Sequence, residues 1–456
     1  MASLGSILSI AASALRAQQK AINVVSHNIA NADTEGYTRQ LPELRPWPAL
    51  TTPQGIFGSG VRVANVTQVR DTLLDRSYLR ELGQGTGERA VHGVLGQVEG
   101  LLAEPGDGGI LSAANDFFSA FSELATRPDN DSARSALRES ANHLADRFQR
   151  IGAGIDDVRV VTEQRLATAV DRVNELAEQI GRISGDIVAD EVTGTVAGDL
   201  RDERRLLIDE LGSLLPIHVE ERADGSVGVT SNGLSLVDGP HFTGVELRSS
   251  GGTLGVGIVG RPGLLPQIGG SLGGLLRTVN TEIPEVVARL DALAAALITE
   301  VNTIHQSGTG PNGATGIDFF SGNSASSMAV SADIAADLGN IAAGTDSAGV
   351  YAAGAGDIAL ALAQLRDSAD LGGLGQGFDG YHQETVTELG LKVRSADTSA
   401  QVHETLAESA DTQRLSVSGV STDEELVRMI QYQTGYQAAA RVIQTAEELL
   451  DTLVNL

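Results

Sequence analysis

Apolar residues recur at alternating spacings of three and four at both ends of the chain, which predicts an amphipathic helix at each end. The first seam consists of Leu4, Leu8, Ala11, Leu15, Ile22, Val25 and Ile29. The second consists of Leu426, Ile430, Tyr436, Ala440, Ile443, Leu450 and Leu453. Any helical bundle shows such seams, but their position at both extreme ends favours assembly between subunits over purely internal packing.

The last helix has a start signal just before its apolar stripe. Ser421 and Glu424 have the spacing of a capping box, in which side chains satisfy free backbone amides. Thr422 and Glu425 offer the same spacing one residue later. The final helix is therefore expected to begin at one of these two hydroxyl residues.

The same helical spacing recurs inside the chain. It predicts helices over residues 155–187, 199–211, 272–304 and 386–410, the last with a seam of small residues. Pro284 lies inside the third pattern and should divide or kink that helix, because proline lacks an amide hydrogen.

Residues 217–259 change to an alternating pattern that predicts short strands. Asp224-Gly225, Asn232-Gly233 and Asp238-Gly239 are turn pairs typical of hairpins. Residues 307–380 are rich in Gly, Ala and Ser and predict loops with one short helix near residues 357–366.

These elements predict an elongated, multidomain and mainly α protein with a small inserted β domain. The expected divisions are a terminal coiled-coil domain of residues 1–45 with 416–456, a discontinuous helix-rich rod domain with some β structure of residues 46–212 with 265–415, a β domain of residues 213–264, and a loop-rich excursion of residues 307–380.

Composition narrows the function classes. The chain has 32 basic and 59 acidic residues, a net charge of −27, so it should repel nucleic acid. It contains no cysteine, which excludes thiolate nucleophiles and cysteine metal sites. No uncharged apolar stretch is long enough to span a membrane. We expect neither a cofactor nor a metal.

Two short motifs match sequence patterns found in enzymes, but only superficially. Residues 269–273 fit the pattern of a hydrolase nucleophile elbow, but no buried strand precedes them, and a helix start capped by Ser271 explains them more simply. Residues 255–260 fit the dinucleotide-binding spacing, yet Arg261 and Pro262 follow where a helix should begin. The sequence therefore predicts a protein that is not an enzyme.

The run from Ser26 to Gln40 closely resembles the amino-terminal signature of the axial proteins of the bacterial flagellum. The motif positions are Asn28, Asn31, Thr34, Gly36, Tyr37, Arg39 and Gln40. Residues 425–456 are similar to the closing helix of the same family, and residues 199–204 and 318–320 resemble its members at the junction between hook and filament.

This resemblance implies a structural subunit of the extracellular flagellum, exported without a cleaved signal peptide and assembled through its terminal helices. Its implied partners are copies of itself in a ring, hook subunits, adjoining junction or filament subunits, and a cytoplasmic export chaperone on the C-terminal helix. The alternatives are a hook or rod subunit or, from another class, a secreted adhesin or enzyme on a helical stalk.

Overall fold

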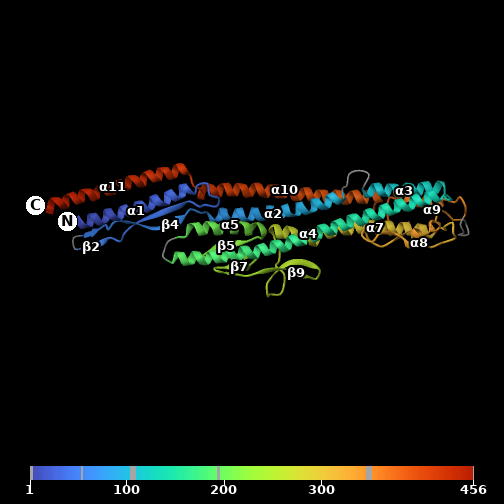
Figure 1. The fold of residues 1–456 in the computed structure, drawn as a ribbon, viewed down its shortest axis with the longest axis horizontal. Coiled ribbons are helices and arrows are strands. Elements are labelled where there is room, and N and C mark those ends of the chain that lie inside the picture. Colours follow the sequence, from blue (N-terminus) through green and yellow to red (C-terminus); the bar gives the residue numbers. More distant parts are fainter. Residues whose placement is uncertain (1–3, 53–54, 103–108, 193–195, 346–351, 455–456) are drawn as a thin grey trace.

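The chain forms an elongated rod with both termini at the same end (Figure 1). This computed structural model describes residues 4–454 except 53–54, 103–108, 193–195 and 346–351. Helix α1 (Leu4–Ala30) and helix α11 (Thr422–Val454) lie side by side at the terminal end, as the two seams predicted. The elongated, mainly helical fold predicted from the sequence is thereby confirmed.

A long β excursion follows α1 and runs back along it. Strand β1 (Gln40–Pro46) pairs antiparallel with β4 (Val61–Gln68), and the small hairpin of β2 (Leu50–Thr52) and β3 (Gly55–Phe57) connects them. Both β1 and β4 contact α1. The sequence pattern did not reveal these strands.

The rod consists of long helices. Helix α2 (Thr72–Leu102) pairs along its length with α10 (Phe378–Ser418), which buries Ala396, Ala400 and Ala407 and so confirms the predicted small-residue seam. Small side chains allow two helices to approach closely.

Helix α4 (Asp131–Glu191) is the spine of the rod, and α3 (Ile110–Thr126) and α5 (Gly198–Leu214) pack against it. It begins 24 residues before the predicted 155–187 segment. The Asn130 side chain caps its first turn by accepting from the amides of Ser132 and Ala133.

The predicted interruption at Pro284 is confirmed. Helix α6 (Gly270–Arg277) passes into a π-helical turn (Thr278–Glu282), and α7 (Ile283–Gln306) begins with the proline in its first turn. The turn before the proline is π-helical, and in it the Ile283 amide donates to the Thr278 carbonyl oxygen. Prolines and π turns are both common causes of an interruption in a long helix.

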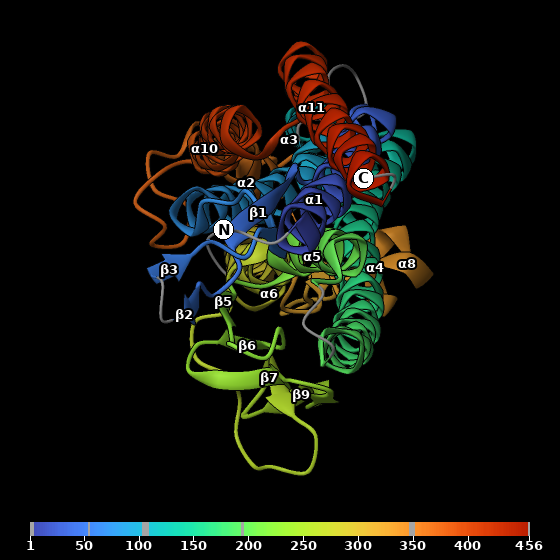
Figure 2. The same ribbon diagram turned by 90° about the vertical axis from the view of Figure 1, so that its left-hand side faces the viewer.

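The β unit projects from one side of the rod (Figures 1 and 2). Its sheet has the order β5 (His218–Glu221), β6 (Val227–Ser231), β7 (Leu234–Asp238) and β8 (His241–Phe242). Strands β9 (Val245–Ser250) and β10 (Thr253–Ile258) form a separate hairpin. The three predicted turn glycines, Gly225, Gly233 and Gly239, all have positive φ.

The excursion after α7 is docked on the far end of the rod. It contains β11 (Phe320–Ser321), β12 (Ala329–Val330), α8 (Ala332–Ala336) and the predicted short helix α9 (Asp357–Gln364). Phe319 and Phe320 are fully buried, make tilted ring contacts with the buried Phe117 of α3, and meet each other edge-on.

We predict that Gly274→Ala destabilises the rod. Helices α2 and α6 cross so closely that a Cβ at Gly274 would overlap the backbone carbonyl of Gly87. Overpacking of this kind costs about 1–3 kcal/mol. The control is Gly93→Ala on the exposed face of α2, where nothing lies within 4 Å; it should raise the free energy of unfolding by up to about 1 kcal/mol. Denaturant unfolding measures both, and equal effects would contradict the prediction.

Candidate assembly site

The two terminal helices meet along small residues. The buried residues of α1 are Ala11, Ala17, Ala21, Val25 and Asn28, and α11 buries Ala439 and Ala446. The two helices approach closely at Gly435, where an added Cβ would lie 2.9 Å from the side-chain amide nitrogen of Gln18. Among the predicted seam residues, Ala11 and Val25 are buried, whereas Leu4, Leu8, Leu15, Ile22 and Ile29 are half-buried.

Part of the predicted C-terminal seam points away from α1. Leu426, Ile430 and Tyr436 are 48%, 62% and 38% exposed. Ala440, Ile443 and Leu450 are half-buried, and the side chain of Leu453 lies outside the described residues. Helix α11 thus presents an outward apolar face, defined by Leu426, Val427, Ile430, Tyr436, Val442 and Leu449.

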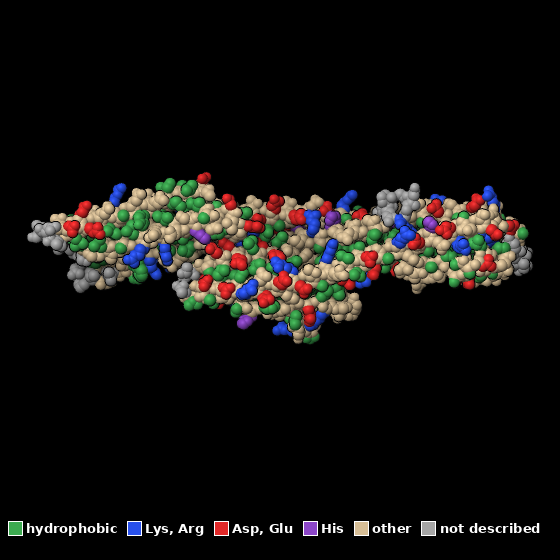
Figure 3. Space-filling model, viewed as in Figure 1, with side chains coloured by type: hydrophobic (Ala, Val, Ile, Leu, Met, Phe, Trp, Pro, Cys, Tyr) green, Lys and Arg blue, Asp and Glu red, His purple; other side chains and the backbone are tan. Residues whose placement is uncertain are grey.

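Other exposed apolar side chains occur at the same end of the molecule. They are Ile7 and Ile10 of α1 together with Leu44, Trp47, Ile56 and Phe57 of the β excursion. Figure 3 shows hydrophobic side chains gathered over the terminal helices. Exposed apolar groups concentrated in one region mark an interaction surface.

The family motif places Asn28 at the centre of a buried contact between the ends of the chain. Asn28 Nδ2 donates to the carbonyl oxygen of Gln40 (2.8 Å) and to Glu425 Oε2 (2.8 Å). Its Oδ1 accepts from the Tyr37 hydroxyl (2.8 Å) and the Gln40 amide (3.0 Å). Burial and three nearby carboxylates raise the pKa of Tyr37 well above its usual value, so the hydroxyl keeps its proton and donates. Asn28 and Glu425 are both fully buried.

Helix α5 holds the same motif from the rod side. Asp202 accepts from the Thr38 amide (2.9 Å) and from Gln68 Nε2 (2.9 Å), so one carboxylate ties the motif and β4 to the rod. Burial raises the pKa of Asp202, although the hydrogen bonds from Thr38 oppose that shift.

Gly36 makes the turn that brings the motif onto α5. Its φ is +77°, and a Cβ there would lie 2.8 Å from the Leu206 side chain. Arg205 Nη2 donates to the Gly36 carbonyl oxygen at 2.5 Å. Glycine is required for both the conformation and the close contact.

The remaining motif residues stabilise the turn and α5. Asp199 Oδ1 lies 3.1 Å from His27 Nε2 and accepts from Gln40 Nε2 at 3.3 Å. Asn31 Nδ2 donates to the His27 carbonyl oxygen (3.0 Å), and Thr34 Oγ1 donates to Asn31 Oδ1 (3.2 Å). These bonds hold the end of α1 and the turn after it together and attach them to helix α5 of the rod.

Arg39 joins the motif to the start of α11. Its amide donates to the Ser418 carbonyl oxygen (2.8 Å), and Nη1 donates to Glu424 Oε2 (2.9 Å). Ser421 caps α11 by accepting from the Glu424 amide (3.4 Å), so the first of the two predicted start signals is the one used. The carboxylate of Glu425 is engaged with Asn28 instead.

We call this region the joint: residues 27–40, residues Asp199, Asp202 and Arg205 of α5, and residues Glu424 and Glu425 of α11. It connects the terminal helix pair to the rod through directional hydrogen bonds, of which the Asn28–Glu425 and Thr38–Asp202 bonds are buried. Such bonds fix a relative orientation more strictly than apolar contact does, because donors and acceptors must align.

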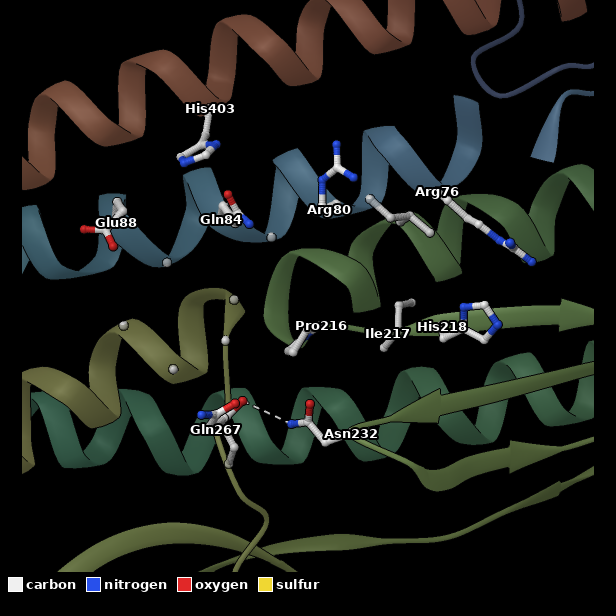
Figure 4. Close-up of a pocket in the computed structure, with 18 of the residues that line it drawn as sticks. Arg76, Arg80, Gln84, Glu88, Pro216, Ile217, His218, Asn232, Gln267 and His403 are labelled. Carbon is white, nitrogen blue, oxygen red and sulfur yellow. Dashed lines mark hydrogen bonds between the residues drawn. The ribbon is translucent and has the colours of Figure 1, made fainter. Parts of the chain in front are cut away.

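A cavity of about 760 Å³ opens between α2, β5 and α6 (Figure 4). Gly269, Gly270 and Gly273 of the elbow-like motif line it, but Ser271 is not among the described residues that do. The predicted Ser271 cap is wrong, because α6 begins at Gly270 with Gly269 as its N-cap. His403 at the cavity is engaged with Glu81 Oε2 at 2.8 Å. The described residues that line the cavity include no serine or threonine.

The dinucleotide-like run of residues 255–260 lies in β10 and the turn after it, within an antiparallel hairpin. Across the described residues, no group of three or more His, Asp or Glu side chains is placed to hold a metal ion. No helix in the described part of the chain has the length and apolarity needed to cross a membrane.

Comparison with known families agrees with this architecture. Residues 8–38 match the family described as flagella basal body rod protein, and residues 411–456 match the flagellar basal body rod FlgEFG protein C-terminal family. Residues 95–320 match the flagellar hook-associated protein FlgK helical domain. The chain thus has the terminal helices and the rod of an axial protein of the bacterial flagellum.

Relatives cover nearly the whole chain. Flagellar hook-associated protein 1 of Bacillus subtilis is 29% identical over 98% of this chain and 97% of its own length, and that of Escherichia coli is 24% identical over 99% and 100%. The fold is similar to that of the flagellar hook junction protein FlgK from Burkholderia pseudomallei, with a TM-score of 0.66 at 15% identity over 76% of this chain and 100% of that one. The chain belongs to the flagellar hook-associated protein 1 family and is a structural protein of the flagellum.

Proposed function

We propose that this chain forms the junction between hook and filament and that it assembles there through its terminal helices. The observation that carries this proposal is the outward apolar face of α11, which lies beside a buried joint. The helical-domain match over residues 95–320 favours a junction subunit over a hook or rod subunit, because the two terminal matches alone are shared with rod proteins.

The outward face of α11 would pack against neighbouring copies in a ring. Side chains such as Leu426 and Ile430 are about half exposed or more in the single chain. Burying a leucine or isoleucine side chain fully stabilises an interface by about 1.5–3 kcal/mol. Ile7, Ile10 and Trp47 extend the apolar surface towards hook subunits and the adjoining junction or filament subunits.

The joint would transmit force from the terminal helices to the rod. It connects residues that are 397 positions apart in the case of Asn28 and Glu425. Together with the Asp202 contacts, it holds α1, α5 and α11 in one arrangement. A coupling between two tubular lattices needs such a stiff connection, because a loose one would let the terminal helices turn without the rod.

Export would require the outward face to be covered. We infer that a cytoplasmic chaperone binds the α11 face that includes Leu426, Ile430 and Tyr436 and that the chain leaves the cell without cleavage of a signal peptide. Support comes from the apolar exposure of that face in the single chain. We further propose that the β excursion of residues 40–68 belongs with the terminal domain, because β1 and β4 run along α1.

The test is complementation of cells that lack this chain, with the full-length protein or with a version ending after Gly419, which removes α11. Hooks without filaments in the null strain, and restored filaments only with the full-length chain, are the expected results. Filaments that persist without the chain would overturn the proposal and leave an adhesin or enzyme on a helical stalk as the alternative.

A further inference from the structure

A second cavity, of about 240 Å³, lies behind the joint between the start of α2, helix α5 and strand β5. Its lining includes five arginines, Arg70, Arg76, Arg201, Arg204 and Arg205, and four carboxylates, Asp75, Asp209, Glu220 and Glu221. The volume is that of about eight water molecules in the liquid. Five guanidinium groups around one small cavity are unusual in a chain with a net charge of −27.

Three of the four carboxylates are already engaged. Asp75 pairs with Arg70 (2.9 Å), and Glu221 pairs with both Arg201 (2.6 Å) and Arg204 (3.1 Å). Asp209 pairs with Arg414, at 3.0 Å. Glu220 is exposed at the rim. The carboxylates of the lining therefore do not form ion pairs with all five arginines.

Arg76 and Arg205 form no ion pair with any residue in the described part of the chain. Arg205 is only 5% exposed, and its Nε has no hydrogen-bond partner among the described residues; nor has Nε of Arg70. A buried guanidinium nitrogen without an acceptor is costly, because it has lost water and gained nothing in exchange.

The electrostatics agree with an anion deficit. Burial lowers the pKa of Arg204 to about 10, and burial together with the neighbouring Arg414 and Arg70 lowers the pKa of Arg205. Both shifts arise first from burial of the charged guanidinium group, which the neighbouring carboxylates only partly offset. An added negative charge at this place would relieve that imbalance.

We propose that this cavity binds a small oxyanion of the phosphate or sulfate type, held by the guanidinium groups of Arg70, Arg76 and Arg205, which line it. Planar guanidinium groups suit the oxygens of such an anion because they donate parallel hydrogen bonds. The bound anion bridges the start of α2 and the middle of α5.

Occupancy therefore stabilises the joint, since Arg205 also donates to Gly36. This site is independent of the junction role: the anion could bind a chain with any function, and a failed test here leaves the proposed function untouched.

The experiment measures thermal unfolding and calorimetric binding of the full chain with sodium phosphate, sodium sulfate, sodium acetate or sodium chloride at matched ionic strength and neutral pH. A binding site predicts saturable stabilisation by phosphate or sulfate, with the folding equilibrium constant rising about elevenfold at ten times the dissociation constant. Acetate should act weakly and chloride not at all. Phosphate and sulfate also stabilise proteins generally, but that effect does not saturate.

The Arg76→Gln variant separates binding at the cavity from the general stabilisation by phosphate and sulfate. Arg76 is exposed and unpaired among the described residues, so its loss should leave stability in chloride unchanged and weaken phosphate binding about tenfold, as expected for a lost charge-assisted hydrogen bond. The control is Arg394→Gln, an exposed arginine of α10 remote from the cavity lining. Phosphate stabilisation that is linear, or equal in both variants and the parent, would overturn the proposal and make the arginine cluster a water-filled ion-pair network.

Discussion

Replacing Leu426 and Ile430 together by glutamate should leave hooks without attached filaments while the chain itself stays folded. Both side chains are exposed in the single chain, so the free energy of unfolding should change by less than about 1 kcal/mol. In an assembled ring the same positions would be buried, and an unpaired buried carboxylate costs several kcal/mol. Because every subunit carries both charges, the penalty recurs around the ring. Motility, electron microscopy of hooks and thermal unfolding measure the outcome.

The matched control moves the same change to the rod. Leu406 and Leu415 of α10 are 46% and 50% exposed, close to Leu426 and Ile430, and their replacement by glutamate adds the same charge. Filaments should remain attached in this control. If the α10 variant lost filaments and the α11 variant kept them, assembly through the terminal helices would be wrong.

Asn28→Asp should loosen the joint strongly at neutral pH and recover in acid. The substitution places a second carboxylate next to that of Glu425, at a position where 2.8 Å separates donor and acceptor, and both residues are fully buried. Two carboxylates this close cannot both ionise, so the pair retains a proton with a raised pKa. Loss of the buried pairing should cost the terminal helices about 3–5 kcal/mol above that pKa. As the pH falls through it, one proton restores a donor and the defect shrinks.

Hydrogen exchange of α1 and α11, measured from neutral to mildly acidic pH, follows this effect. The double variant Asn28→Asp with Glu425→Gln restores an amide donor opposite a carboxylate and should recover most protection at neutral pH. Asn23→Asp, on the exposed face of α1, is the control for added charge and should behave like the parent. Unchanged exchange in Asn28→Asp, or a double variant as loose as the single one, would contradict the role given to this contact.

Local signals carried much of the prediction. Seams spaced by three and four identified the terminal helices, the Ser421 cap located the start of α11, and Pro284 marked the break before α7. Each of these features depends on residues within one or two helical turns of one another, so it can be recognised in the sequence alone.

The sequence predicted the structure less well where the hydrophobic pattern was weak or where the interacting residues lie far apart in the chain. Ala17 and Ala21 are buried in α1 but do not belong to the predicted seam, because alanine contributes little to a hydrophobic pattern. Strands β1 to β4 lack clear alternation, since β1 is only partly buried along its length. The hydrogen bond from Asn28 to Glu425 joins opposite ends of the chain, and no spacing rule reaches that far.

By itself, therefore, the sequence determined that both ends and several internal segments are helical, where α11 starts and where the helix before α7 is interrupted, and, through its two terminal motifs, which family the chain resembles. It did not reveal α2 and α3 or the true start of α4. Only the tertiary structure decided which face of each terminal helix is buried, because periodicity marks an apolar stripe without naming its partner. It turned Leu426 and Ile430 outward, brought Asn28 to Glu425, and gathered five arginines from α5, from α2 and from the segment leading into α2 around one cavity. Each of these depends on packing between segments far apart in the chain, where geometry and not local propensity selects the contact.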